Sequence, residues 1–458
     1  MPKKKTALTI EERLQQALVP AEEQPYEVPE NWVWVRLGEV NKYISKSVNP
    51  ISEPDKIFEL YSVPSMVDNY PEIIAGSDIG SSKQSVCKKD VLLCKINPRI
   101  NRVWKVSQFT DNELIASSEW IIIRNNHIDA NYLMYCFQSK YFREFMLSNV
   151  SGVGGSLMRA QPKYVQTYPI PLPPLSEQQR IVERIEELFA KLDEAKERLQ
   201  EVAESFAVRK AALLHKAFTG ELTKQWRREN GVSDESWEES NLGSFIACGP
   251  QNGLYKPKSS YGDGIRIIRI DAFYDGVIEQ WDELKRLRLD ENEIECYSLN
   301  LNDILINRVN SMQYLGKSAL VRELKDICVF ESNIMRLSVD ESRIYPEFLS
   351  SFLNSQMGLN ELRKNAKQAV NQASINQQDI KNVIINLPPL PEQHEIVRLI
   401  DDLLARERAA QQAAEQALAS IDLMKKSILA RAFRGELGTN KASEASALEL
   451  LRQVLAEG

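Results

Sequence analysis

Apolar residues recur at alternating spacings of four and three in two segments of this chain. The first seam comprises Ile181, Ile185, Leu188, Leu192, Ala195, Leu199, Val202 and Phe206, and the second, interrupted at Glu407, comprises Ile396, Ile400, Leu403, Ala410, Ala414, Ala417 and Ile421. This spacing is typical of a coiled-coil helix. The pattern predicts two helices of about 40 residues, roughly 60 Å long, that can pair with each other.

Both predicted helices have matching start and stop signals. Pro173-Pro174 and Pro388-Pro389 precede them, and Gly220 and Gly435 lie where they should end. Proline favours a helix start because it lacks an N–H, and glycine favours a helix end because it tolerates the left-handed conformation. Ser176 is the expected N-cap of the first helix.

The helices belong to an internal repeat. Ile170-Pro-Leu-Pro-Pro-Leu-Ser-Glu-Gln178 matches Ile385-Asn-Leu-Pro-Pro-Leu-Pro-Glu-Gln393 at an offset of 215 residues. The same offset aligns Ala217-Phe-Thr-Gly-Glu-Leu222 with Ala432-Phe-Arg-Gly-Glu-Leu437. A register kept over that distance indicates duplication.

The segments before the helices resemble each other more weakly. Asp90-Val-Leu-Leu-Cys-Lys95 parallels Asp303-Ile-Leu-Ile-Asn-Arg308, which predicts an acidic turn followed by a buried strand. Ile128-Asp-Ala-Asn-Tyr-Leu133 parallels Ile344-Tyr-Pro-Glu-Phe-Leu349, which predicts a short amphipathic helix. The expected fold is α+β, with two similar α/β domains separated by two long antiparallel coiled-coil helices and related by pseudo-two-fold symmetry.

The repeat also predicts the domain boundaries. An N-terminal arm covers 1–30, a first domain 31–175, and a first helix with its linker 176–235. A second domain then covers 236–390, the second helix 391–438, and a C-terminal tail helix 439–458.

The Leu-Pro-Pro-Leu-x-Glu-Gln helix start and the Ala-Phe-x-Gly-Glu-Leu helix end, each present twice around two variable domains, resemble the specificity subunits of type I restriction-modification enzymes. The resemblance covers nearly the whole chain. It implies two target-recognition domains, each reading one half of an asymmetric, bipartite site in double-stranded DNA.

The same resemblance implies partners and divides the chemistry among them. The helices would set the spacer between the half-sites and dock two modification methyltransferase subunits, with restriction and translocase subunits as further partners. Those partners would bind S-adenosylmethionine, ATP and Mg²⁺. This chain would hold no cofactor or metal and would not itself be an enzyme.

The net charge of −7 alone disfavours a nucleic-acid binder, but the acidic residues are unevenly distributed. Asp and Glu are absent from 91–110, 145–176, 304–322 and 362–378, and each of these acid-free windows contains Lys or Arg. Lys, Arg, Asn and Gln read base edges, and basic and hydroxyl groups hold phosphates. The windows are therefore the predicted DNA-binding segments.

In the first domain the predicted DNA-binding residues are Lys95, Asn97, Arg99, Asn101, Arg102, Lys105, Ser151, Ser156, Arg159 and Lys163. In the second domain they are Asn307, Arg308, Asn310, Ser311, Gln313, Tyr314, Lys364, Lys367, Gln368, Asn371, Gln372 and Ser374, together with Asn252, Lys256 and Lys258 near its start. The alternative for any single residue is a solvated loop. The matching positions of the windows in the two repeats favour binding.

Catalytic signatures are incomplete. Asn97-Pro98-Arg99 has only part of the Asn/Asp-Pro-Pro-Tyr/Phe motif of an adenine methyltransferase. Gly316-Lys317-Ser318 resembles the end of a phosphate loop, but Ser311 occupies the upstream glycine position. A fused enzyme and a protein-binding scaffold are the alternatives to a DNA-binding subunit. Only about 30 residues precede the repeat and about 20 follow it, too few for a catalytic domain.

The remaining features point to the cytoplasm. The six cysteines contain no CxxC pair, and there is no apolar run of 18 residues or signal peptide. We therefore expect a cytoplasmic protein that does not contact the membrane.

Overall fold

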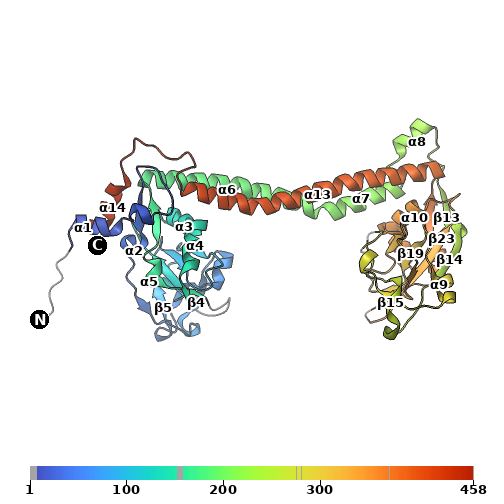
Figure 1. Ribbon diagram of the computed structural model, residues 1–458, viewed down its shortest axis with the longest axis horizontal. Helices are drawn as coiled ribbons and strands as arrows, with labels where there is room; N and C mark the ends of the chain where they lie inside the picture. Colours follow the sequence, from blue (N-terminus) through green and yellow to red (C-terminus); the bar gives the residue numbers. More distant parts are fainter. Residues whose placement is uncertain (1–7, 152–157, 275, 280, 371, 457–458) are drawn as a thin grey trace. The chain divides into compact units, whose positions relative to one another are not determined.

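The computed structural model describes residues 8–151, 158–274, 276–279, 281–370 and 372–456 (Figure 1). The chain divides into two compact units, the first formed by Met1–Leu199 with Gln416–Gly458 and the second by Gln200–Glu415. Each unit combines one α+β domain with segments of two long helices, which confirms the expected fold class.

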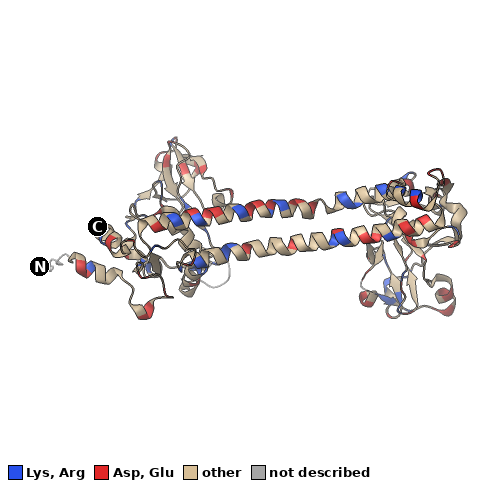
Figure 2. Ribbon diagram, turned by 90° about the horizontal axis from the view of Figure 1, so that it is seen from above, with Lys and Arg blue, Asp and Glu red and all other residues tan. Residues whose placement is uncertain are grey.

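The helical repeat forms α6 (Leu175–Glu204), α7 (Phe206–Phe218) and α13 (Leu390–Ala432). The second predicted helix is continuous, but the first is divided at Ser205, whose hydroxyl donates to the carbonyl oxygen of Glu201 at 2.6 Å. Such bonding back to the preceding turn bends or interrupts helices. Lys, Arg, Asp and Glu residues occur along both long helices (Figure 2).

The predicted helix ends are confirmed, whereas the predicted N-cap is wrong. Gly220 (φ 77°) and Gly435 (φ 74°) adopt the left-handed conformation just beyond α7 and α13. Since α6 begins at Leu175, Ser176 lies inside its first turn. The carbonyl oxygen of Pro174 instead accepts the first backbone hydrogen bonds of the helix.

The glutamate of the repeated motif is a structural anchor. In the first unit Glu177 is fully buried and accepts hydrogen bonds from Trp32 Nε1 at 2.7 Å and from Asn440 Nδ2 at 2.9 Å. Trp32 precedes the first strand of the domain, and Asn440 follows the end of α13. The start of α6 is thereby fixed both to its own domain and to the chain that follows α13.

The equivalent glutamate of the second unit has an equivalent role. Glu392, also fully buried, accepts from Thr223 Oγ1 at 2.6 Å, Arg227 Nη1 at 2.7 Å and Trp237 Nε1 at 3.2 Å. Thr223 and Arg227 follow the end of α7. Within each unit, therefore, the start of one helix contacts the end of the other, and the two helical segments are antiparallel.

The glutamine of the motif joins the helix start to its domain. Gln178 accepts from the backbone N–H of Asp129 at 2.9 Å, and Gln393 accepts from that of Tyr345 at 2.7 Å. Each glutamine also donates to the carbonyl oxygen of the first proline of its pair at 2.9 Å. These two matching contacts explain why the glutamine occurs in both copies of the repeat.

Ion pairs continue the contact between the helices within each unit. In the first unit Lys425 Nζ lies 2.6 Å from Asp193 Oδ1, and in the second Arg209 Nε lies 2.7 Å from Glu407 Oε2. Glu407, which interrupts the apolar seam, thus has a cationic partner on the neighbouring helix.

Three sheets form the body of the domain of the first unit, and a fourth, two-stranded sheet pairs Val150–Ser151 with Arg159–Ala160. The largest sheet has five strands in the order β2 (Ser47–Val48), β5 (Lys83–Ser85), β8 (Glu113–Ala116), β3 (Ile57–Tyr61) and β4 (Glu72–Ala75). The second sheet has the order β7 (Val103–Lys105), β6 (Val91–Cys94) and β9 (Trp120–Ile123). In the third, β1 (Val33–Arg36) pairs with β12 (Pro169–Leu172). Since β12 leads directly into α6, its pairing with β1 closes the domain where the helix begins.

The helices of this domain are α3 (Ala130–Gln138), α4 (Lys140–Ser148) and α5 (Pro162–Val165). The apolar face of α3 packs into one continuous core with β6, β9 and the start of α6. Asp129 caps α3 by accepting from the N–H groups of Asn131 and Tyr132.

The domain of the second unit repeats this arrangement. Its central sheet has the order β14 (Ile246–Asn252), β23 (Ile334–Val339), β19 (Ile304–Asn307) and β21 (Ser318–Leu320). A second sheet has the order β18 (Arg286–Leu287), β15 (Tyr261–Ile268) and β22 (Cys328–Phe330). In a third, β13 (Glu238–Asn241) pairs with β26 (Ile384–Leu387). The helices are α9 (Glu291–Tyr297), α10 (Pro346–Leu353), α11 (Gln356–Arg363) and α12 (Gln377–Lys381). As predicted, the strands after Asp90 and Asp303 are buried centres of their sheets.

Two terminal helices complete the first unit. α1 (Ile10–Ala17) contacts α14 (Ala447–Ala456), and both contact α2 (Leu37–Val40). Leu14 of α1 and Leu451 of α14 are buried in the same core as α3. The described part of the N-terminal arm therefore packs on the first domain.

Candidate nucleic-acid interface

The two acid-free windows of the first domain meet in space. The loop after β6 pairs with β11 (Arg159–Ala160) through a bridge between Ile96 and Arg159. The N–H of Ala160 donates to the carbonyl oxygen of Lys95, and the N–H of Asn97 donates to that of Met158, both at 2.8 Å. β11 in turn pairs with β10 (Val150–Ser151).

The two acid-free windows of the second domain meet in the same way. β20 (Val309–Asn310), which follows β19, pairs with β25 (Ala373–Ser374), and β25 pairs with β24 (Lys367–Gln368). The N–H of Ile375 donates to the carbonyl oxygen of Arg308 at 2.9 Å. This bond is the counterpart of the one between Ala160 and Lys95.

A third segment supports both loops. The N–H of Lys95 donates to the carbonyl oxygen of Glu119 at 3.0 Å, and the N–H of Arg308 donates to that of Asn333 at 2.8 Å. Both acceptors lie just before the next strand of the central sheet, β9 or β23. In each unit, therefore, the basic residue that follows the central strand, Lys95 or Arg308, is held by equivalent backbone hydrogen bonds from both its N–H and its carbonyl oxygen.

The side chains at these equivalent positions differ. Arg159 contacts the carboxylate of Glu119 at 3.2 and 3.3 Å, and these hydrogen bonds raise its pKa. Ser374 occupies the equivalent position in the second unit. Arg308 is half-buried and donates from Nη1 to the carbonyl oxygen of Ser332 at 2.9 Å. The two interfaces therefore have the same backbone hydrogen-bonding arrangement but present different polar side chains.

Most of the predicted residues lie on these interfaces or on segments that adjoin them. The exposed ones are Arg99, Ser151, Lys163, Asn252, Lys258, Ser311, Gln313, Lys364, Lys367, Gln368 and Gln372, and the half-buried ones are Lys95, Asn97, Asn101, Arg102, Lys105, Arg159, Lys256, Arg308, Asn310, Tyr314 and Ser374. Ser156 and Asn371 lie outside the described residues. Several residues already have protein partners, such as Asn101, whose Nδ2 donates to the carbonyl oxygen of Gln138.

Two residues of the acid-free windows, Asn307 and Lys105, do not contribute side chains to the paired surface. Asn307 is only 1% exposed, because it ends a central strand that is covered on both faces. Lys105 pairs in register with Val91, at the end of β6 remote from the 95–102 loop, and its Nζ contacts Asn131 Oδ1 at 2.5 Å. Neither side chain is presented alongside the others in the free protein.

The acidic residues of the central-strand turns have structural partners. Asp90 accepts from the guanidinium of Arg124 at 2.6 and 2.7 Å, and it also caps its turn by accepting from the N–H of Cys87. Asp303 caps the equivalent turn through the N–H of Asn300, and burial raises the pKa of its carboxyl group. These carboxylates shape the turn before the strand and are not free for chemistry.

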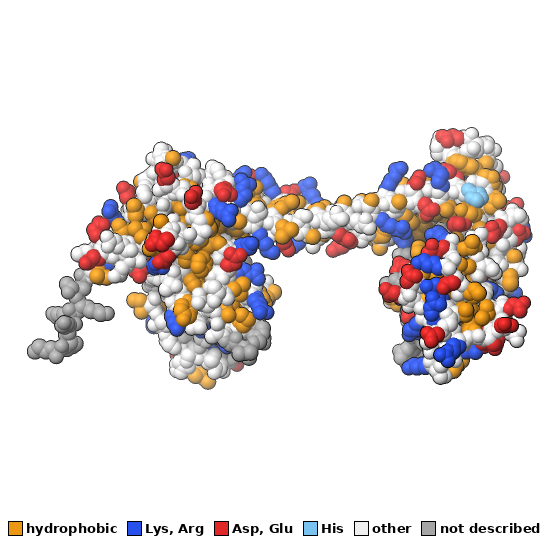
Figure 3. Space-filling model, in the orientation of Figure 1, with side chains coloured by type: hydrophobic (Ala, Val, Ile, Leu, Met, Phe, Trp, Pro, Cys, Tyr) orange, Lys and Arg blue, Asp and Glu red, His pale blue; other side chains and the backbone are white. Residues whose placement is uncertain are grey.

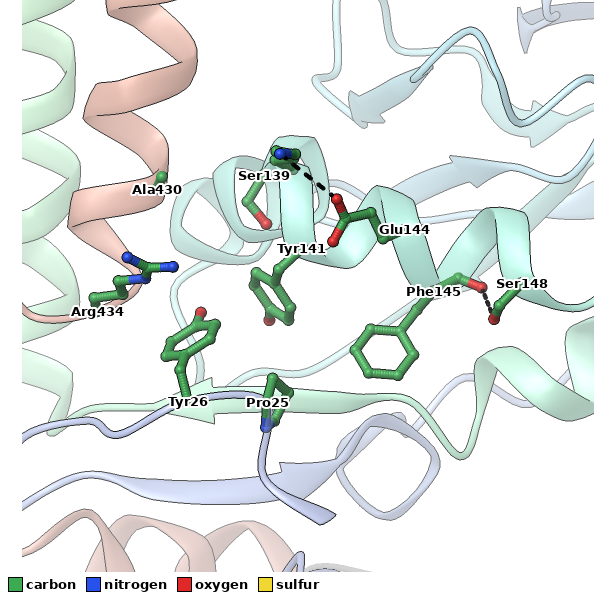
Figure 4. A pocket seen from close by; sticks show the side chains of 10 residues that line it. Pro25, Tyr26, Ser139, Tyr141, Glu144, Phe145, Ser148, Ala430 and Arg434 are labelled. Carbon is green, nitrogen blue, oxygen red and sulfur yellow. Dashed lines mark hydrogen bonds and ion pairs between the residues drawn. The ribbon is translucent and has the colours of Figure 1, made fainter. Parts of the chain in front are cut away.

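A separate cavity of about 490 Å³ lies in the first unit, between the N-terminal arm, α4 and the chain that follows α13 (Figure 4). Tyr26 and Tyr141 lie edge to face at 5.5 Å, and Arg434 lies over the ring of Tyr26. Its lining includes Tyr26, Tyr141 and Phe145 but none of the predicted DNA-binding residues, so this cavity is distinct from the nucleic-acid interface.

The described residues contain no group of three or more His, Cys, Asp or Glu side chains arranged to hold a metal ion. Among the described helices, none has the length and apolar character needed to cross a membrane. Basic and acidic side chains are interspersed on the visible face of each unit, so the cationic regions are local (Figure 3).

Sequence reasoning missed the groups that hold the interface together. Glu119 lies outside the acid-free windows, yet the fold brings its carboxylate to Arg159. The buried roles of Glu177 and Gln178 were also missed, although their recurrence at Glu392 and Gln393 was the available signal.

Comparison with known proteins gives a consistent result. The sequence model of a family described as "Type I restriction modification DNA specificity domain" matches residues 29–204 and 234–417. The StySPI type I restriction enzyme specificity subunit of Salmonella potsdam is 33% identical over 341 residues, which cover 72% of each chain. The EcoKI specificity subunit of Escherichia coli strain K12 is 29% identical over 343 residues, again 72% of each chain.

The fold is also similar to a solved structure. The HsdS subunit from Thermoanaerobacter tengcongensis superimposes with a TM-score of 0.65 at 24% identity, over 90% of this chain and 99% of that one. The family match covers both copies of the internal repeat, and more than half of the chain. This chain therefore belongs to the family of type I restriction-modification DNA specificity proteins.

Proposed function

We propose that this chain reads an asymmetric, bipartite site in double-stranded DNA, with one half-site contacted by each domain. The observation that carries the proposal is the joining of two acid-free windows in each unit by equivalent backbone hydrogen bonds. Windows that lack acidic residues and contain Lys, Arg, Asn and Gln side chains match both the phosphates and the base edges of DNA.

The differences between the two interfaces support an asymmetric site. Arg159 and Ser374 are equivalent, as are Lys95 and Arg308, and each pair differs in size and donor geometry. Arg presents a planar fork that suits guanine, whereas Lys presents a single charged donor. Two domains with different donors should prefer different bases, so the half-sites should not be palindromic.

The long helices have two functions in this proposal. As a spacer, they set the separation between the half-sites, for which about one DNA turn, roughly 34–36 Å, would present the same groove face to both domains. They also dock two modification methyltransferase subunits, to which restriction and translocase subunits are added. We infer that S-adenosylmethionine, ATP and Mg²⁺ bind to those partners, that this chain is not itself an enzyme, and that the complex acts in the cytoplasm.

The direct test combines the purified chain with its methyltransferase partner and labelled duplexes. Sequencing of modified bases in a host that carries the system first defines the site. Specific binding and methylation of that duplex, and of neither a shuffled duplex nor one with an altered spacer, is the expected result. Binding without any sequence dependence would instead favour a protein scaffold.

A further inference from the structure

The second unit contains a concave basic surface that lies outside the paired acid-free windows and includes the predicted residues Lys256 and Lys258. A cavity of about 870 Å³ lies beside β15, and its described lining residues include five Lys or Arg side chains and no Asp or Glu. Lys258 and Lys285 are exposed, and no ion-pair partner within the described part of the chain neutralises them. The surface therefore carries uncompensated positive charge.

The other cations of the cavity are held in position by carboxylate or carbonyl oxygens. Lys256 Nζ lies 2.5 Å from Glu293 Oε1, and Arg269 Nε lies 3.2 Å from Glu331 Oε2. Arg286 donates to the carbonyl oxygen of Gly264 at 2.8 Å. These contacts fix the wall of the cavity, whereas the two unpaired lysines retain all their donors for a ligand.

Aromatic rings lie among these cations. Tyr255 is 79% exposed, which is unusual for a large aromatic side chain, and Tyr261 is half-buried in the same lining. Exposed rings beside basic groups are typical of surfaces that contact the bases or sugars of nucleic acids while the cations hold the phosphates.

The cavity adjoins the candidate interface through the backbone. The N–H of Ser332 donates to the carbonyl oxygen of Leu254 at 2.9 Å, and the carbonyl oxygen of Ser332 accepts from Arg308 Nη1 at 2.9 Å. Tyr255 is the residue after Leu254. Two hydrogen bonds, both made by the backbone of Ser332, therefore link the edge of the cavity to Arg308 at the end of the central strand.

We propose that this cavity binds a nucleotide unit, with Lys258 and Lys285 on the phosphate and Tyr255 against the sugar or base. The inference rests on the proposed function, since the nearest source of such a unit is the DNA backbone that flanks the second half-site. A free nucleotide has the same chemistry, and the test includes it separately.

The duplex test uses the full chain in complex with its methyltransferase partner and the duplex defined by base sequencing. The double variant Lys258→Ala/Lys285→Ala should bind it on the order of tenfold more weakly at low salt, and the slope of log affinity against log salt should fall by about two. The matched control, Lys224→Ala/Lys381→Ala, removes two exposed lysines of the same unit that lie outside the cavity. It should leave the slope unchanged.

Tyr255 gives a readout that charge alone would not produce. Tyr255→Phe keeps the ring and should bind like the wild type, whereas Tyr255→Ala should weaken binding several-fold. Because all three altered side chains are exposed, folding should be preserved.

The free-nucleotide test uses the full chain alone and fluorescent methylanthraniloyl-ATP. Saturable binding that the lysine double variant abolishes would support the cavity with a free nucleotide as its source. If the double variant equals its control with the duplex and the wild type does not bind the nucleotide, the proposal is overturned.

Failure of the proposed function has a different signature. The wild-type chain would then bind the defined and shuffled duplexes equally. The Lys258→Ala/Lys285→Ala variant would still reduce the slope of log affinity against log salt, because phosphate contacts do not depend on base sequence.

Discussion

Glu177 and Glu392 occupy equivalent positions, but only Glu392 has a cation in direct contact. Arg227 is itself largely buried and donates to Glu392 Oε1, whereas Glu177 is bonded to neutral donors. The same motif residue is therefore half of a buried ion pair in one unit and a carboxylate hydrogen-bonded to neutral donors in the other.

This difference predicts unequal effects of the same substitution. Glu177→Gln should change the free energy of unfolding by less than about 1 kcal/mol, since the amide oxygen can still accept from Trp32 and Asn440. Glu392→Gln should destabilise by about 2–3 kcal/mol, because Arg227 loses its buried anionic partner and keeps only the exposed Asp234, and because one of the three donors to Glu392 loses its acceptor. Scanning calorimetry of both variants measures the change in unfolding free energy, and equal changes would contradict this prediction.

The environment of Glu177 also predicts a pH dependence. Burial raises the pKa of its carboxyl group above the usual 4.5, although hydrogen bonds from Trp32 and Asn440 act in the opposite direction. Because the folded chain holds this proton more tightly than the unfolded chain, the stabilisation is complete below the unfolded pKa and is lost as pH rises through the folded pKa. The melting temperature of the wild type relative to Glu177→Gln should therefore fall as the pH rises above the ordinary carboxyl pKa of 4.5. A constant difference would exclude this role.

Lys95 and Arg308 provide matched controls for each other in DNA recognition. Arg308→Ala should weaken recognition of one half-site by about 1–3 kcal/mol if the guanidinium reads a guanine, and Lys95→Ala should affect only the other half-site. Fluorescence anisotropy with duplexes altered in one half-site at a time measures both effects. Uniform weakening on all duplexes would identify Arg308 as a phosphate contact instead.

At the level of elements, each interface depends on pairing between segments that lie far apart in the chain. The 95–102 loop and β11 are joined by the bond from the N–H of Ala160 to the carbonyl oxygen of Lys95. Their joint position, more than any single side chain, decides which polar groups meet the DNA.

Removing that bond should separate the two segments. Ala160→Pro deletes the donor and should weaken recognition of the first half-site by at least about 1 kcal/mol, with the second half-site unaffected. Ala160→Gly retains the N–H and is the control. Binding to duplexes with either half-site shuffled is the measurement. Equal loss for both variants would show that the Ala160 methyl group, which is buried, matters more than the hydrogen bond.

At the level of the whole molecule, the proposed spacer predicts a change in site geometry without a change in bases. Four residues inserted into α6 between Ala195 and Leu199, with four inserted into α13 after Ala417, lengthen both helices by about one turn. Both insertions preserve the ion pairs Asp193–Lys425 and Arg209–Glu407, because each pair lies within one unit and the inserted residues lie between the two pairs. The preferred spacer should lengthen while both half-sites stay the same. Altered bases with an unchanged spacer would contradict the proposal.

Part of this protein was predictable because its signals are local. Apolar periodicity depends on neighbouring turns of one helix, and the prolines and glycines act at their own positions. Because the module is duplicated, each of these signals occurs twice in the sequence. The long helices, the α+β fold class and the family could therefore be predicted from the sequence. The division at Ser205 did not, because a side chain bonding to the preceding turn leaves no mark in the apolar pattern.

The tertiary structure decided what composition could not. Acid-free windows identify segments, but a central strand covered on both faces buries Asn307, and strand register places Lys105 at the remote end of β6. Which windows meet, and which carboxylate meets Arg159, depends on backbone pairing between segments about 60 residues apart. The sequence by itself therefore determined the repeat, the helices and the residue types of the interface, whereas long-range hydrogen bonds decided which of those residues share one surface.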